Sequence, residues 1–198
     1  IEMLFTDIMS ENIVAMRNED GEWIGSLAEI GWQHLKGYWV YVIEPVEFMF
    51  NLTDNLPKFV NNEIPDYNIY NYPFMLRYKQ SQRQSFYYFK NATIDNESIT
   101  ENDWIIAYNN DSIVGARKWS GPYTDVPVMG SDGFDETEDY CDDNSKVSFK
   151  VLQHSTGELI VMDGQIPKWS DRTNFMVDVL HEKSVLPQEY NLSMPYPN

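Results

Sequence analysis

The chain has 198 residues, 42% of them hydrophobic and 15% aromatic, which supplies a core for one globular domain or two small ones and excludes a disordered chain. Its 31 acidic and 14 basic residues give a formal net charge of -17, which repels the phosphates of nucleic acid and the anionic headgroups of a bare membrane. We therefore expect neither of these as a partner.

The first 50 residues predict a small β-rich N-terminal subdomain. Residues 13–16 and 38–43 are runs of β-branched and aromatic side chains, and residues 47–51 are a candidate continuation. Between them, residues 22–30 fit the apolar period of a short helix as poorly as that of a strand, so both interpretations stay open. Because the chain goes from Ile1 directly into structured-looking sequence, we expect a fragment or processed product of a longer protein.

Residues 51–73 predict an ordered connector. This stretch is rich in Asn and Pro, and its apolar side chains follow no clean period. Proline cannot donate a hydrogen bond to a sheet, so a central strand is not expected here.

Residues 74–182 predict an antiparallel β-sandwich domain, followed by a C-terminal tail over residues 183–198. Alternating aromatic and β-branched runs indicate strands at residues 75–80, 86–90, 104–108, 113–117, 147–152, 158–162 and 175–180. Asn109, Asn110 and Asp111 join two of these runs, and Asn and Asp tolerate the positive φ of a tight hairpin turn. Many short strands without long helices between them favour two packed sheets, and therefore an all-β or mainly β fold.

Residues 131–144 form an acidic loop with seven carboxylates and no Lys or Arg. Ca²⁺ takes 6–8 oxygen ligands in irregular geometry, so the loop is a candidate calcium site, although it departs from the EF-hand pattern. The candidate ligands are Asp132, Asp135, Glu136, Asp139, Asp142 and Asp143. A solvated acidic loop and a surface that docks a partner are the alternatives that the sequence leaves open.

The many aromatic side chains raise the possibility of stacking on the flat faces of sugars. Residues such as Trp104 and Tyr88 fall within predicted strands, where they are expected to fill the core. Trp119 and Tyr123 flank a Ser-Gly-Pro segment that predicts a loop. They are therefore the candidate residues for ligand stacking.

No catalytic motif supports an enzyme. The three histidines, His34, His154 and His181, lie far apart and lack metal-ligand spacing. The single cysteine, Cys141, excludes an intrachain disulfide, and its acidic neighbours are expected to raise the pKa of its thiol, which is unfavourable for a nucleophile. Paired carboxylates for glycoside hydrolysis remain an alternative, but no sequence feature selects two of them.

Several motifs resemble a module of large virion structural proteins in marine T4-like phages, especially cyanophages, and segments of secreted surface proteins of marine bacteria. The motifs lie at residues 23–27, 36–39, 102–108, 114–119 and 125–133. The family runs from an aspartate-tryptophan-isoleucine strand to a valine-glycine-alanine-arginine strand and then an acidic loop. The resemblance covers roughly residues 20–165 and implies a position on the virion exterior, in a fibre, neck or head appendage, or in a secreted adhesin.

The chain departs from this family at Ser112 and Ile113, where a cysteine-containing variant is common, so a shared thiol role is not expected. Patterning and resemblance together predict a non-enzymatic structural or attachment module on a virion surface or outside a cell. Its expected partners are other virion or surface-protein subunits, a cell-surface glycan, or further copies of the chain. The alternative is a carbohydrate-binding module with Ca²⁺ in the acidic loop.

Overall fold

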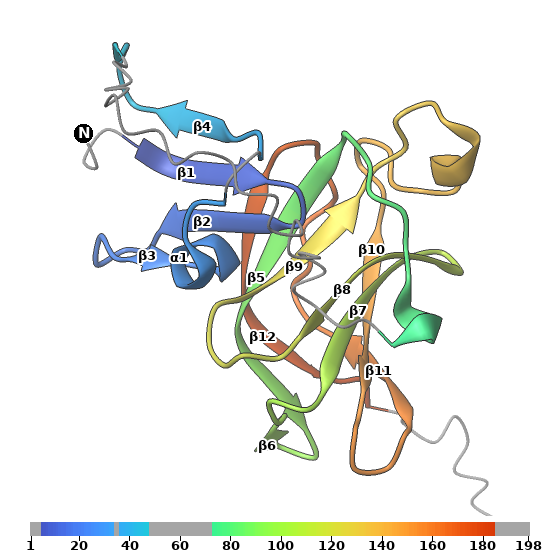
Figure 1. The fold of residues 1–198 in the computed structure, drawn as a ribbon. Coiled ribbons are helices and arrows are strands. Elements are labelled where there is room, and N and C mark those ends of the chain that lie inside the picture. The colour runs from blue at the N-terminus through green and yellow to red at the C-terminus, as the bar shows by residue number, and fades with distance from the viewer. Residues whose placement is uncertain (1–4, 34–35, 48–72, 185–198) are drawn as a thin grey trace, which may run out of the picture.

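The computed structural model describes residues 5–33, 36–47 and 73–184. Its strands form two sheets, a four-stranded N-terminal sheet and a larger curled sheet (Figure 1). This arrangement confirms the all-β class and the smaller β-rich N-terminal unit. Nearly all of the predicted connector and C-terminal tail, and the proposed continuation beyond residue 47, lie outside the described residues. Within those residues, no helix is long and apolar enough to cross a membrane.

The N-terminal sheet has the strand order β3-β2-β1-β4. Its elements are β1 (Phe5–Ser10), β2 (Ile13–Arg17), β3 (Trp23–Ile24), the short helix α1 (Ser26–Ile30) and β4 (Trp39–Val42). The ambiguous residues 22–30 contain both a strand and a helix, because Gly25, with φ of 101°, turns the chain between β3 and α1. Strand β1 was not predicted, since its apolar and polar residues alternate only weakly.

The larger sheet has eight strands in the order β6-β5-β12-β11-β10-β7-β8, with β9 paired to β5. The strands are β5 (Gln84–Ile94), β6 (Glu97–Ser98), β7 (Trp104–Asn109), β8 (Ser112–Lys118), β9 (Thr124–Met129), β10 (Val147–Leu152), β11 (Leu159–Asp163) and β12 (Asn174–Glu182). The pairing is antiparallel except between β5 and β12, which run parallel, so the expectation of a wholly antiparallel sheet is wrong at this pair. The β7–β8 hairpin is confirmed, with Asn110 at φ 53°.

The predicted strand at residues 75–80 is wrong. A 3-10 turn, η2 (Phe74–Leu76), begins this segment, and the residues after it form no ladder. Leu76 is buried against Trp104, Ile106 and Tyr108 of β7. Leu76 and the half-buried Tyr78 therefore cover the outer face of a strand instead of extending the sheet, whereas Met75 is exposed.

The curled sheet closes where β8 and β9 lie side by side. A Cβ atom at Gly115 would stand 1.7 Å from the carbonyl oxygen of Pro127, so only glycine permits this approach. Strand β9 was missed in the sequence because of Pro127. A proline is tolerated here because the β9 ladder in the described residues runs along one side only, toward β5.

Strand β5 separates two apolar layers. Tyr87 and Phe89 point into the main core inside the curled sheet, whereas Phe86 and Tyr88 pack against Met9 and Val14 of the N-terminal sheet. Successive side chains of a strand alternate between its faces, so an uninterrupted aromatic run fits a strand buried on both sides. The N-terminal sheet is thus packed on the outside of the larger one.

Candidate functional site

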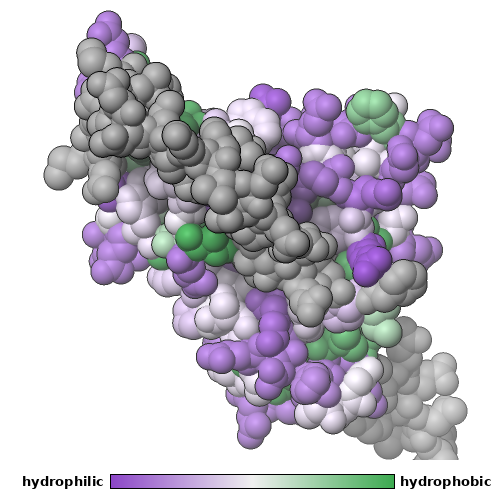
Figure 2. All heavy atoms as spheres, viewed as in Figure 1, coloured by the Kyte–Doolittle hydropathy of each residue, from purple (hydrophilic) through white to green (hydrophobic). Residues whose placement is uncertain are grey.

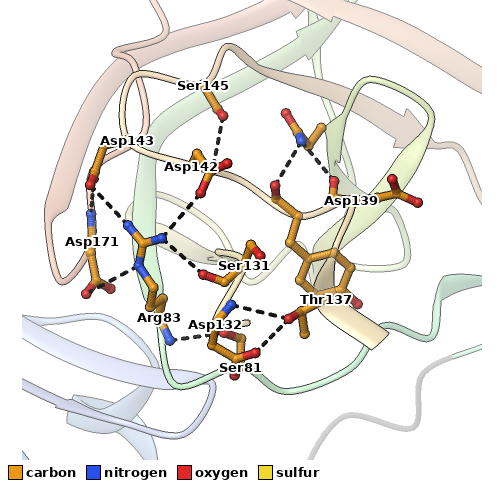
Figure 3. Close-up of polar contacts among 12 residues, drawn as sticks. Ser81, Arg83, Ser131, Asp132, Thr137, Asp139, Asp142, Asp143, Ser145 and Asp171 are labelled. Carbon is orange, nitrogen blue, oxygen red and sulfur yellow. Dashed lines mark hydrogen bonds and ion pairs between the residues drawn. The ribbon is translucent and has the colours of Figure 1, made fainter. Parts of the chain in front are cut away.

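The acidic loop is held at its base by one arginine. The Arg83 guanidinium donates hydrogen bonds to the Ser131 carbonyl at 3.0 Å and to the carboxylates of Asp142 at 3.4 Å and Asp143 at 3.1 Å. Figure 3 shows these acceptors and Asp171 around the guanidinium. Arg83 also lies 5.1 Å from the ring centroid of Trp169, and so its position is fixed by charge and by stacking.

Asp132 organises the first turn of the loop. Its carboxylate accepts hydrogen bonds from the Thr137 hydroxyl at 2.6 Å and from the backbone N–H of Gln82 at 3.1 Å. The hydrogen bond from Thr137 and those from backbone N–H groups lower the pKa of Asp132. This carboxylate therefore closes a turn and ties it to the segment before β5.

The remaining candidate calcium ligands point elsewhere. Asp135 and Glu136 are exposed on the 3-10 turn η3 (Asp135–Thr137), and Asp139 lies on the far side of the loop from Arg83 (Figure 3). Figure 2 shows hydrophilic side chains gathered over this loop. In the part of the chain that the structure describes, no group of three or more His, Cys, Asp or Glu side chains is placed to hold a metal ion. The six predicted ligands are thus divided among an arginine clamp, a turn and open solvent.

Neither candidate stacking residue presents an open ring. Trp119 is only 6% exposed and belongs to the main core, with its backbone N–H bonded to the Asp103 carbonyl at 2.9 Å. The expectation of an exposed Trp119 is therefore wrong. Tyr123, at φ 68°, is half-buried and packs against the apolar layer between the two sheets.

A buried ion pair that sequence reasoning missed lies where the two sheets meet. Arg117 on β8 and Asp125 on β9 are 2.9 Å apart, with side chains 3% and 4% exposed. The Arg117 Nε also donates to the backbone carbonyl of Asp125 at 2.7 Å. The signal in the sequence was a charged residue beside the apolar run of each strand, Arg117 after residues 113–116 and Asp125 before residues 126–129, because a buried charge needs a partner.

The N-terminal unit completes this network through the first residue of α1 and the turn between β1 and β2. Asp125 accepts hydrogen bonds from the Ser26 backbone N–H at 2.7 Å and from the Ser26 hydroxyl at 2.8 Å, while Arg117 donates to the carbonyl of Asn12. Burial raises the pKa of Asp125, and Arg117 and Ser26 oppose that rise. The charged and polar groups are thus used to fix one sheet against the other.

Gly25 is required for this junction. A Cβ atom there would stand 2.6 Å from the Val14 carbonyl oxygen and 2.7 Å from the hydroxyl of Tyr88, whose side chain is fully buried. Burial raises the pKa of Tyr88 well above its usual value, and Asp125 adds to the rise. The junction is therefore a closely packed polar contact without room for a ligand.

The thiol of Cys141 is also buried. Burial raises its pKa to about 12, with a smaller contribution from Asp142. The predicted direction of the shift is confirmed, although desolvation, which sequence reasoning did not invoke, is the larger cause. His154 and His181 are exposed on separate segments, and His34 lies outside the described residues.

Exposed apolar side chains concentrate at β4. Ten large hydrophobic side chains are exposed among the described residues, and five of them lie within residues 32–43. They are Trp32, Trp39, Tyr41, Val42 and Ile43. We call residues 38–43 the edge strip, because β4 is an outer strand of the N-terminal sheet. Exposed apolar patches of this kind mark surfaces that contact other molecules.

The edge strip is fixed to the larger sheet from behind. The Tyr41 hydroxyl donates to the Arg172 carbonyl at 2.9 Å, and the Arg172 guanidinium lies 5.9 Å from the ring centroid of Trp39. Both aromatic side chains nevertheless remain 40% exposed. The strip is therefore an apolar surface that is attached to the larger sheet.

No protein-family model, curated protein or solved structure matches the chain.

Proposed function

We propose that this chain is a non-enzymatic structural or attachment module of a virion surface or of a secreted surface protein, of the kind found in a fibre, neck or head appendage. The observation that carries the proposal is the exposed apolar edge strip on a sheet that is fixed to the rest of the body. Apolar side chains held outward on a rigid scaffold are suited to permanent contact with another protein surface.

The polar constellations support the same role. Arg83 holds the acidic loop, and the ion pair of Arg117 and Asp125 holds the two sheets together. These charged groups fix the geometry of the fold and are paired with one another. A net charge of -17 adds solubility in salty surroundings, where screening over roughly 3–10 Å weakens self-repulsion.

The role can be tested on intact source particles or cells with an antibody raised against the folded chain. Surface labelling visible by electron microscopy before any lysis is the expected result. Labelling that appears only after lysis would overturn the proposal. This experiment does not depend on which surface of the chain makes the contact.

Carbohydrate binding is the second candidate, and the observation that favours it is Trp32. Its side chain is 63% exposed although its ring contacts that of Tyr38, with ring centroids 4.6 Å apart, so much of the indole is open to contact with a sugar ring. A glycan array probed with the wild-type chain and with Trp32→Ala tests it. Glycan binding that Trp32→Ala abolishes would replace protein assembly with sugar attachment, whereas an array without signal leaves the structural role.

A further inference from the structure

The outer side of β4 resembles an unprotected sheet edge. In the described residues β4 pairs with β1 on one side only, and a strand at a sheet edge offers unpaired N–H and C=O groups to another chain. Proteins commonly protect such edges with lysine or proline. The edge strip contains neither, since its sequence is Tyr-Trp-Val-Tyr-Val-Ile, and the next proline is Pro45.

The edge strip is complementary to itself. A two-fold axis perpendicular to a sheet reverses the strand direction but keeps each face on its own side, so residues of one face meet residues of the same face in the second copy. Trp39 and Tyr41 share a face, and Ile43, 67% exposed, follows at the same spacing. With the axis at Tyr41, Trp39 lies opposite Ile43 of the second copy, and aromatic and β-branched side chains pair favourably across strands.

The charges at the two ends of the strip agree with this pairing. Lys36 precedes the strip and Glu44 follows it, with no charged residue between them. Antiparallel alignment brings Lys36 of each copy to the Glu44 end of the other. Lys36 already lies 2.5 Å from Glu11 in its own chain. In the dimer, the ammonium group of Lys36 would therefore have Glu11 of its own copy and Glu44 of the other copy nearby.

We infer that the edge strip binds a second copy of this chain, through antiparallel pairing of β4 with its symmetry mate and with the two-fold axis at Tyr41. The N-terminal sheets of the two copies then form one continuous sheet. This inference names the partner of the proposed structural module and rests on that proposal. Because the strip is short and a standard interface buries ~800 Å² per partner, we expect association in the micromolar range.

The first test is the mass in solution across a concentration series, by sedimentation or light scattering. The wild-type chain should approach twice its 23.2 kDa, and Ile43→Lys should remain a monomer. Val161→Lys is the matched control, because Val161 is an exposed β-branched residue on β11 of the other sheet, and it should dimerise normally. A wild-type monomer at millimolar concentration, or a dimer that Ile43→Lys leaves intact, would overturn the inference.

The second test locates the axis. Cys141 is buried, so Tyr41→Cys introduces the single exposed thiol of the chain, and mild oxidation should give a disulfide-linked dimer. Leu159→Cys, exposed on β11, should remain largely uncrosslinked. Equal crosslinking of the two variants would contradict the pairing even if dimers form.

Salt distinguishes a second copy from a basic partner protein. Two copies of charge -17 repel each other, so added NaCl should tighten the dimer, whereas NaCl would weaken a complex with a cationic partner. Association that weakens with salt would overturn self-pairing. If the chain is monomeric in solution but the antibody still labels intact particles or cells, self-pairing is wrong and the proposed structural role stands.

Discussion

The carboxylate of Asp125 lies 2.9 Å from the guanidinium of Arg117, and both side chains are almost completely buried at the junction of the two sheets. Ser26, the first residue of α1 in the N-terminal unit, binds the same carboxylate through its backbone N–H and its hydroxyl. A buried ion pair adds little net stability over an apolar pair, but its directional bonds specify one arrangement. The junction therefore sets where the edge strip stands relative to the larger sheet.

Asp125→Asn should destabilise the protein strongly. The substitution leaves the buried Arg117 charge without its counter-ion, which costs ~3–5 kcal/mol. Urea unfolding followed by tryptophan fluorescence measures the loss. Asp178→Asn is the control, because its exposed pair with Lys90 at 2.8 Å is screened by solvent and should contribute little to stability. Equal effects of the two substitutions would show that the junction does not hold the sheets together.

Gly115→Ala should disrupt the closure of the larger sheet. The added methyl would overlap the Pro127 carbonyl oxygen, which is backbone and cannot rotate away, so we expect a loss of about 3 kcal/mol or more. Gly37→Ala is the matched control, since no atom lies within 4 Å of the added Cβ there. Thermal unfolding compares the two variants, and a Gly115→Ala protein as stable as Gly37→Ala would contradict the close approach of β8 and β9.

Calcium should leave the melting temperature unchanged. Asp142 and Asp143 are engaged by Arg83, and Asp132 by Thr137, so binding an ion in the loop would require these contacts to break. Melting curves in millimolar Ca²⁺, in Mg²⁺ and in EDTA at equal ionic strength provide the measurement. A rise specific to Ca²⁺ that Asp132→Asn removes would restore the calcium site.

Stability should fall at alkaline pH. Burial raises the pKa of Cys141 to about 12, whereas the pKa of a cysteine in an unfolded chain is about 8.5. As the pH rises, the thiol therefore ionises in the unfolded chain before it ionises in the folded protein. Its contribution is therefore complete below pH ~8.5 and is lost at up to ~1.4 kcal/mol per pH unit above it. The buried Tyr87 and Tyr88 add the same effect above pH ~10, because burial raises the pKa of each.

Urea unfolding at intervals from neutral pH to pH ~11 measures this dependence. Cys141→Ala is the control, since it removes the thiol and should flatten the curve below pH ~10. A wild-type free energy of unfolding that stays constant across this range would contradict the burial of these groups.

The fold class and most strands of the second half could be predicted because their signals are local. The aromatic run in β5 and the Asn-rich hairpin turn after β7 each occupy a few consecutive residues. Strand β9 was not predicted because it contains Pro127. A proline is tolerated in this strand only because β9 forms its ladder on one side, toward β5, and this arrangement is defined by the complete fold. The same holds for residues 75–80, which cover a strand made much later in the chain.

The candidate site was less accessible to sequence reasoning because its contacts join distant residues. The acidic loop is dense in carboxylates, yet the orientation of two of them is set by ion pairs with Arg83, about 60 residues earlier in the chain. Trp119 stands next to turn-forming residues but is folded into the core. In contrast, residues 38–43 were correctly identified as a strand, and only the sheet order reveals that this strand is at an edge.

The most direct test of the structural role is cross-linking mass spectrometry with an amine-reactive reagent on intact source particles or cells. We expect links from Lys36, beside the edge strip, to another protein chain, and few from Lys146 or Lys168, which lie in loops next to strands of the larger sheet. Links that arise chiefly from Lys146 and Lys168, or the absence of any link between chains, would contradict it.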